Sequence, residues 1–207
     1  YFPYTLKDIE EETFYGFINL SKVGYTDEKG QVIDDTLPPL ITVIHPNTFY
    51  RTSLKTITAS SVTELETACF GSCSSLVSAT FSSDLTLIGD ESFYGCILLE
   101  SFDIGNKATE VGTSSFRTCY SLKTIDLQNV KTVYNYAFQY CSQLNSINLR
   151  SVEVIAEYVF ADLETLNSID LPSTLRELHS YCFMRTPLKT VTGNPEKVTE
   201  IKSSFAF

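Results

Sequence analysis

The sequence lacks several residues and patterns on which common functions depend. Among its 207 residues there is no tryptophan, one methionine and two histidines. No apolar run approaches the roughly 20 residues that cross a membrane, and nothing resembles a signal peptide. The sequence also has no Gly-x-Ser-x-Gly, no His-Glu-x-x-His, no phosphate-binding loop and no dinucleotide fingerprint. We therefore predict no catalytic residues and no enzymatic activity.

Basic residues are scarce as well. Lysine and arginine number 15 against 25 aspartates and glutamates, which gives a formal net charge of −10 and an isoelectric point near 4.6. Nucleic-acid phosphates and anionic lipid surfaces both attract a positive protein surface. We expect neither nucleic acid nor an anionic membrane as a partner, and no membrane insertion by this chain.

Metal ligands are equally sparse. His45 and His179 are six repeat units apart, too far to share a site. There is no Cys-x-x-Cys, and the one short spacing, Cys69-x-x-x-Cys73, has no histidine nearby. We predict no metal site and no cofactor.

What the sequence has is a repeat. The stretch Leu122–Gln143 (LKTIDLQNVKTVYNYAFQYCSQ) is followed at once by two similar stretches that begin at Leu144 and Leu166. Across the chain the opening leucine recurs at positions 54, 76, 99, 122, 144, 166 and 188, and a phenylalanine recurs at positions 49, 70, 93, 116, 138, 160, 183 and 205. Steps of 21 to 23 residues sustained this long predict a solenoid.

Each unit contains a strand signal and a turn signal. Ile125 and Leu127 are two residues apart, so they point to one face of a strand while Thr124 and Asp126 point to the other. The phenylalanine falls in a short Tyr-Ala-Phe segment that suits a turn of helix. One unit cannot fold alone, because ordering a residue costs about 1–2 kcal/mol of backbone entropy. Stacked units would form a parallel sheet on one face, with the phenylalanine turns opposite.

We expect one domain over residues 1–207. Residues 1–36 are a divergent N-terminal unit, in which Asp27-Glu28-Lys29-Gly30 predicts an inserted hairpin or long loop at about 25–36. Residues 37–207 are the regular repeats of 21–23 residues. The chain begins without methionine and ends inside a unit, which suggests a fragment of a longer protein with any export signal outside it.

Four of the six cysteines share one position of the repeat. Cys73, Cys96, Cys119 and Cys141 each follow a phenylalanine by three residues, where other units have Phe17, Thr52, Leu163 and Thr186. A position shared with leucine and phenylalanine is a packing position, where cysteine acts as a small hydrophobe. Buried free thiols are the favoured interpretation, although stacked units would also bring neighbouring Cα atoms within disulfide range.

The outward positions of the predicted strands form the first candidate binding surface. Hydroxyl residues form one column and acidic or amide residues the next; the candidate residues are Asp103, Thr124, Asp126, Ser146, Asn148, Ser168 and Asp170. Such a face could bind a basic protein segment, a glycan, or a cation between Asp103 and Asp126. Equally, serine and threonine suit solvated strands without any ligand.

A tyrosine column on the flank is the second candidate surface. Tyr136, Tyr158 and Tyr181 each precede a phenylalanine by two residues in consecutive units. Tyrosine is enriched at protein interfaces. Packing between units explains the same column.

The motif Leu-x-x-Ile-x-Leu, a later apolar pair and Ala-Phe-x-x-Cys, best seen from Leu122 to Cys141, resembles the BspA-like (treponemal-type) leucine-rich repeat. The resemblance runs from about Leu37 onward. It implies an α/β fold: a right-handed solenoid with the parallel sheet on the concave face and short helices or helical turns on the convex face. The chain departs from the general leucine-rich pattern at Val130, where that pattern has asparagine or cysteine.

Proteins of this family are displayed on or secreted from cells and are associated with adhesion to host matrix proteins. The resemblance thus implies a non-catalytic recognition module at the cell surface or secreted, which binds a protein or glycoprotein, such as a host extracellular matrix protein, through the concave face. An intracellular leucine-rich repeat scaffold that holds partner proteins is the alternative. A domain attached to a hydrolase is a third.

Overall fold

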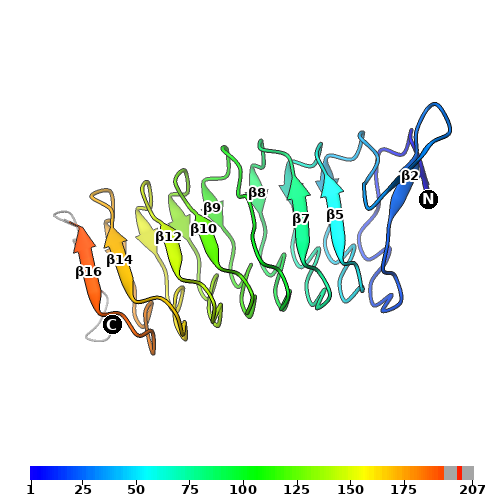
Figure 1. Cartoon of the computed structure of the whole chain (residues 1–207). Coiled ribbons are helices and arrows are strands. Elements are labelled where there is room, and N and C mark those ends of the chain that lie inside the picture. Colours follow the sequence, from blue (N-terminus) through cyan, green and yellow to red (C-terminus); the bar gives the residue numbers. More distant parts are fainter. Residues whose placement is uncertain (194–199, 202–207) are drawn as a thin grey trace.

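The chain folds as a solenoid of stacked coils (Figure 1). A computed structural model describes residues 1–193 and 200–201. Strands lie on two faces of the solenoid. The strands of the first face are β5 (Thr56–Ala59), β7 (Ser78–Phe81), β10 (Thr124–Asp126), β12 (Ser146–Asn148), β14 (Ser168–Leu171) and β16 (Thr190–Gly193). The strands of the second face are β4 (Val43–Ile44), β6 (Glu64–Leu65), β8 (Leu87–Ile88), β9 (Glu110–Val111), β11 (Thr132–Val133), β13 (Val154–Ile155), β15 (Glu177–Leu178) and β17 (Glu200–Ile201).

Strands of the first face pair in parallel, one coil apart. Ile125 of β10 lies opposite Ile147 of β12, and Thr124 lies opposite Ser146. The first-face ladder is interrupted, because β5 pairs with β7, β10 with β12, and β14 with β16 in three separate sheets. The register confirms the predicted stacking of equivalent residues on adjacent rungs.

The second face has the longer ladders. Its strands form one sheet in the order β4-β6-β8 and another in the order β17-β15-β13-β11-β9, all in parallel. Each strand of this face from β4 to β15 contributes one inward side chain, for example Val133 opposite Ile155. Two-residue strands suffice because each strand inside a sheet has a paired strand on both sides.

A column of phenylalanines fills the third side of the coil, which we call the phenylalanine corner. Seven of its rings, from Phe49 to Phe183, are at most 1 % exposed. Together with Phe14 they stack face to face, with centroids 5.2–5.7 Å apart and planes within 17° of parallel. Apolar burial of about 1.5–3 kcal/mol per side chain, repeated at each coil, supplies the stability that one unit lacks.

The predicted short helices of the convex side are wrong. None of the described residues is helical; the phenylalanine corner is a series of turns. Tyr136 and Tyr140 have left-handed backbones, with φ of 61° and 63°. As a result, the amides of Tyr136, Phe138 and Tyr140 donate to carbonyls of the next coil, while the Gln139 amide between them donates back to Tyr136. In an α-helix all of these amides would bond within the chain segment itself.

The spacing between coils explains why the phenylalanine corner is built of turns and not of helices. Helices pack with their axes about 8–10 Å apart, whereas the rings of Phe138 and Phe160 stack with centroids 5.7 Å apart. That separation is close to the spacing of about 4.8 Å between paired strands. Corner and sheets therefore stack at similar intervals, and the coils form a gently bowed rod (Figure 1).

The cysteine column lies beside the phenylalanines. All six cysteines are buried, and Cys69, Cys73, Cys96, Cys119 and Cys141 are free thiols, which confirms the favoured interpretation for the column. The thiols of Cys73, Cys96, Cys119 and Cys141 lie 2.9–3.2 Å from phenylalanine carbonyl oxygens of the preceding coil, to which they donate. Thr186, at the same position, donates its hydroxyl to the Phe160 oxygen at 2.6 Å. The position thus suits a small side chain that can donate a hydrogen bond.

The N-terminal region departs from the regular coil. Ile9 and Phe14 join the core columns, but β2 (Gly24–Thr26) and β3 (Val32–Asp34) form an antiparallel hairpin whose turn contains Asp27. Strand β1 (Phe2–Pro3) pairs in parallel with β2. The hairpin projects from one end of the rod (Figure 1).

Candidate binding surfaces

The first face presents the predicted polar columns to solvent. All seven candidates are exposed: Asp103, Thr124, Asp126, Ser146, Asn148, Ser168 and Asp170. Pairing of β10 with β12 brings Asp126 beside Asn148, and pairing of β14 with β16 brings Asp170 beside Thr192. Asp103 lies outside any strand, and the candidates divide between two separate sheets.

Most of the acidic column is engaged in the turns that end the strands. The Asp126 Oδ1 accepts the Gln128 amide at 3.0 Å and the Asn148 side-chain amide at 2.9 Å. The Asp103 Oδ1 likewise accepts the Gly105 amide at 2.8 Å. A carboxylate that accepts an amide two residues on stabilises a turn. These side chains therefore have a structural role, which their position after a strand could have indicated.

Asp170 differs from the rest of the column. The residue two positions on is Pro172, which has no amide hydrogen to donate. The Asp170 Oδ1 instead accepts the Thr192 hydroxyl of the next coil at 2.8 Å. The Asp-x-Pro spacing was the sequence signal for this difference, and sequence reasoning missed it.

A hollow lies where the first-face ladder is broken between β12 and β14. It measures about 470 Å³ and is lined by Ile147, Asn148, Leu149, Arg150, Asp170, Pro172 and Ser173. Ile147 is half-buried there, although Ile125 and Ile169 on the neighbouring rungs are buried. The hollow thus combines a carboxylate, an amide and a guanidinium with apolar side chains. Sequence reasoning identified Asn148 and Asp170 but not Arg150 or Pro172.

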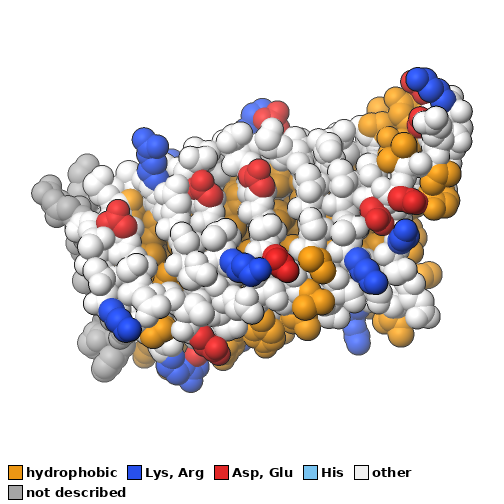
Figure 2. All heavy atoms as spheres, in the orientation of Figure 1, with side chains coloured by type: hydrophobic (Ala, Val, Ile, Leu, Met, Phe, Trp, Pro, Cys, Tyr) orange, Lys and Arg blue, Asp and Glu red, His pale blue; other side chains and the backbone are white. Residues whose placement is uncertain are grey.

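Charge on the first face is mixed. Figure 2, which has the orientation of Figure 1, shows acidic and basic side chains scattered among uncharged ones. Two cross-coil ion pairs contribute, Lys123 with Glu100 at 2.9 Å and Lys107 with Asp84 at 3.2 Å. The net negative charge of the chain is therefore not gathered into one acidic stripe in this view.

The predicted tyrosine column forms a continuous stack. The rings of Tyr136 and Tyr158 are 5.1 Å apart, and those of Tyr158 and Tyr181 are 5.0 Å apart. The Arg117 guanidinium lies 5.4 Å from the Tyr136 ring centroid and 5.8 Å from that of Tyr140. All three column residues are half-buried. The rings thus pack on one another, and a partner would reach only their edges.

The part of the chain that the structure describes lacks two further kinds of site. It contains no group of three or more histidine, cysteine, aspartate or glutamate side chains that could hold a metal ion. It also contains no helix long and apolar enough to span a bilayer.

Comparison with solved structures supports the fold. The chain is similar to a leucine-rich repeat protein from Eubacterium ventriosum (22% identity, TM-score 0.59, 98% of this chain and 56% of that one). It is also similar to one from Bacteroides ovatus (21%, 0.55, 76% and 50%) and to the T. pallidum leucine-rich repeat protein (16%, 0.53, 70% and 87%). The chain thus spans about half the length of the first two.

Sequence comparison identifies the family. No curated protein sequence matches the chain. A family profile described as a BspA type leucine-rich repeat region matches in six copies, over residues 1–123, 42–160 and 131–207. Since these matches together span the chain, it belongs to the BspA-type leucine-rich repeat family.

Proposed function

We propose that this chain is a non-catalytic recognition module that binds a protein or glycoprotein through its first face. The proposal places the module at the cell surface or in a secreted protein, with host matrix proteins as the partner class that the family resemblance suggests. It treats residues 1–207 as one repeat domain. The first face is favoured over the tyrosine column because the tyrosine rings are occupied with one another.

One observation carries the proposal. The hollow between β12 and β14 places Asp170, Asn148 and Arg150 beside the half-buried Ile147 and Pro172. Asp170 has one carboxylate oxygen bonded to Thr192 and none bonded to its own turn. A concave site with a few polar groups among apolar ones is the usual form of a binding site.

The test reverses charge at this hollow. Binding of the purified chain to immobilised matrix proteins and mucin glycans would be measured for the wild type, for Asp170→Lys, and for Asp170→Lys combined with Asp126→Lys. We expect each variant to weaken binding by about tenfold or more, because a lysine placed opposite a basic side chain of the partner protein costs several kcal/mol. Thermal unfolding should change little for Asp170→Lys and somewhat more for the double variant, which loses the Asp126 turn bonds.

Glu28→Lys combined with Glu164→Lys is the matched control. Both residues are exposed, outside the first-face strands, and carry the same charge as the test positions. The control should bind like the wild type. If the Asp170 variants also bind like the wild type, the first face is not the binding surface.

A second function, an intracellular scaffold that holds partner proteins, is favoured by one feature. Cys69, Cys73, Cys96, Cys119 and Cys141 are free thiols, and free thiols are typical of reducing compartments. Antibody labelling of intact and permeabilised cells that express the full-length protein separates the two. Label on intact cells supports display, and label only after permeabilisation supports the scaffold.

A further inference from the structure

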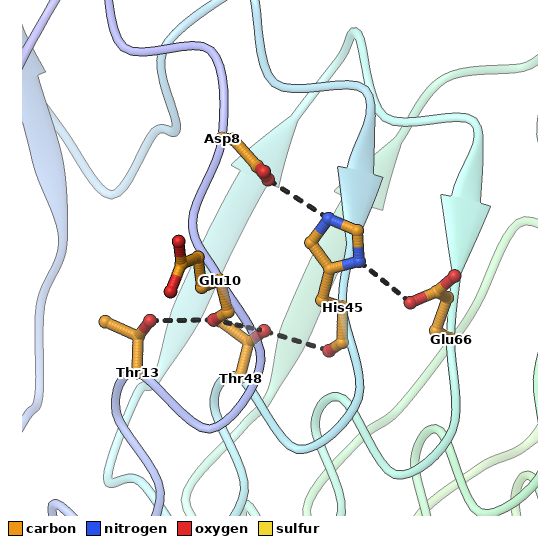
Figure 3. Close-up of polar contacts among 6 residues, drawn as sticks. All are labelled: Asp8, Glu10, Thr13, His45, Thr48 and Glu66. Carbon is orange, nitrogen blue, oxygen red and sulfur yellow. Dashed lines mark hydrogen bonds and ion pairs between the residues drawn. The ribbon is translucent and has the colours of Figure 1, made fainter.

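His45 joins three consecutive coils through its side chain (Figure 3). Its Nε2 lies 3.1 Å from the Asp8 Oδ1 of the preceding coil, and its Nδ1 lies 2.9 Å from the Glu66 Oε2 of the following coil. The side chains of His45 and Glu66 are about one third exposed, whereas that of Asp8 is 60% exposed. The imidazole thus bridges two carboxylates that belong to neighbours on opposite sides.

This geometry specifies a protonation state. A neutral imidazole has one N–H donor and one lone-pair acceptor, whereas an imidazolium has two donors. An ionised carboxylate only accepts hydrogen bonds, so a neutral ring would turn its lone pair toward one of the two carboxylates. Only the imidazolium satisfies both contacts at once.

The charged surroundings favour the same state. The hollow beside the ring is lined by Asp8, Glu10, Glu11 and His45, and Glu66 faces the ring from the other side. Within the described part of the chain, no lysine or arginine forms an ion pair with Asp8 or Glu66. The hydrogen bond to Glu66, followed by the charge of Asp8, raises the pKa of His45 above its ordinary value, while partial burial opposes the rise.

The bridge lies where strand pairing between coils is missing on the second face. On the second face, β4 is the edge strand of its sheet, so residues 6–10 add no paired strand beyond it. The first coil is instead held at the corner, where the amides of Glu12, Phe14 and Gly16 donate to the next coil at 2.8–3.0 Å. Phe14, which stacks on Phe49, is itself only half-buried. The contact between Asp8 and His45 therefore substitutes for the absent strand pair.

We propose that His45 is a protonation-dependent clamp that holds the N-terminal coil, residues 6–20, onto the rest of the solenoid. With the imidazolium present, the coil is held at both the corner and the second face. Loss of the proton leaves one N–H, which stays with Glu66, the closer and less exposed carboxylate. Asp8 then turns to solvent, and the N-terminal coil loses its charged contact on the second face. It keeps the corner bonds, the hydrogen bond from the Thr48 hydroxyl to the Glu10 carbonyl oxygen (3.5 Å) and the packing of Ile9.

The raised pKa of His45 determines how the stabilisation by the clamp changes with pH. The stabilisation is fully present below the ordinary histidine pKa of about 6.5. It declines as pH rises through the higher pKa of the folded protein. The N-terminal coil should therefore be held more firmly at mildly acidic pH than at alkaline pH.

Hydrogen exchange with mass spectrometry at pH 5.5 and 8.5, corrected for the intrinsic exchange rate, tests the clamp. Peptides that cover residues 6–20 should lose protection at pH 8.5 by about two- to fivefold, the range expected for a partly exposed ion pair. Peptides that cover residues 116–160 should not change. His45→Gln should abolish the pH dependence of the N-terminal peptides.

His179→Gln is the matched control. His179 also lies four residues before a phenylalanine, but it contacts Glu177 of its own coil at 3.2 Å and, among the residues that the structure describes, forms no bridge between coils. This variant should keep the pH dependence of residues 6–20. The clamp is refuted if the wild type shows equal protection at both pH values, if His45→Gln retains the pH dependence, or if NMR titration gives His45 a pKa at or below about 6.5.

Discussion

The phenylalanine corner and the first face differ in how closely their residues repeat from coil to coil. At the corner one residue type recurs in coil after coil, its rings stack 5.2–5.7 Å apart, and the seven rings from Phe49 onward are almost fully enclosed. On the first face one outward column holds serine or threonine in every coil, whereas the next column changes among threonine, aspartate and asparagine, and the ladder breaks into three pairs of strands. Packing of the rings at the corner thus fixes how the coils stack. The residue types on the first face are not needed for that stacking and can differ between coils.

The difference also appears in how each region satisfies its polar groups. At the corner, backbone amides donate alternately to the same coil and to the next, and buried thiols donate to the remaining carbonyl lone pairs. On the first face, side chains such as Asp126 supply the hydrogen bonds of the turns. A change at the corner therefore acts on packing between coils, whereas a change on the first face acts on one turn and on a side-chain hydrogen bond to the next coil.

The largest effect is expected from removal of one ring at the corner. Phe116 is fully buried between Phe93 and Phe138, with centroids at 5.4 and 5.3 Å. Phe116→Ala should lower the free energy of unfolding by about 3–5 kcal/mol, because it removes apolar contacts and leaves a cavity. Denaturant unfolding followed by circular dichroism measures the loss.

Tyr120→Ala is the control for that variant, since Tyr120 lies in the same coil and is 46% exposed. It should cost no more than about 0.5 kcal/mol, as is usual for surface sites. Equal losses for the two variants would contradict the comparison, because the corner would then be no more important than the surface.

A smaller, stabilising effect is expected from the backbone of the corner. Thr118 is a β-branched residue with a left-handed backbone, φ 63°, whereas Gly95 has the equivalent position in the preceding coil with φ 74°. Left-handed geometry costs an ordinary residue about 1–2 kcal/mol. Glycine avoids that cost but loses more entropy on folding.

Thr118→Gly should therefore raise the free energy of unfolding by about 0.5–1 kcal/mol. Its midpoint in denaturant would be compared with that of Thr113→Gly, a position in the same coil that is absent from the left-handed set. Destabilisation by Thr118→Gly as large as that by Thr113→Gly would mean that the left-handed corner carries no strain.

Periodicity was sufficient to predict the stacking but not the form of the corner. The spacing of the phenylalanines and of Ile125 and Ile147 predicted the core columns and the rungs, because burial selects residue type at each recurrence. The left-handed positions carry ordinary residues such as Ala68 and Thr118, so they leave almost no compositional trace. A Tyr-Ala-Phe segment that favours a helical turn in isolation is overridden by bonds to the neighbouring coil.

For the candidate surfaces, too, the sequence predicted the repeating features but not the features that occur once. Strand period predicted which side chains are exposed on the first face. The hollow depends on the failure of β12 to pair with β14, which is a property of two coils rather than of either sequence. The His45 clamp likewise joins residues of three coils. The repeat position of His45 holds Glu10, Glu66 and His179 in three other coils but glycine, tyrosine or alanine in the rest of the coils up to residue 183, so no regular column signals the clamp. Contacts between coils that do not recur are invisible to an analysis based on recurrence.

An effect of similar size is expected within the first face, and it distinguishes two of its aspartates. Asp126 accepts hydrogen bonds from Gln128 and Asn148, whereas Asp170 accepts one from Thr192 and none from its own turn. Asp126→Ala should lower the free energy of unfolding by about 0.5–1.5 kcal/mol, the range of a typical hydrogen bond. Asp170→Ala should cost no more than about 0.5 kcal/mol.

Asp126→Asn, which can still accept the Gln128 amide, should recover most of the stability lost by Asp126→Ala in the same denaturant experiment. If Asp170→Ala proves the more costly of the two alanine variants, Asp170 is a structural residue. The hollow between β12 and β14 would then result from the way Pro172 shapes the chain, and the binding surface would lie elsewhere on the rod.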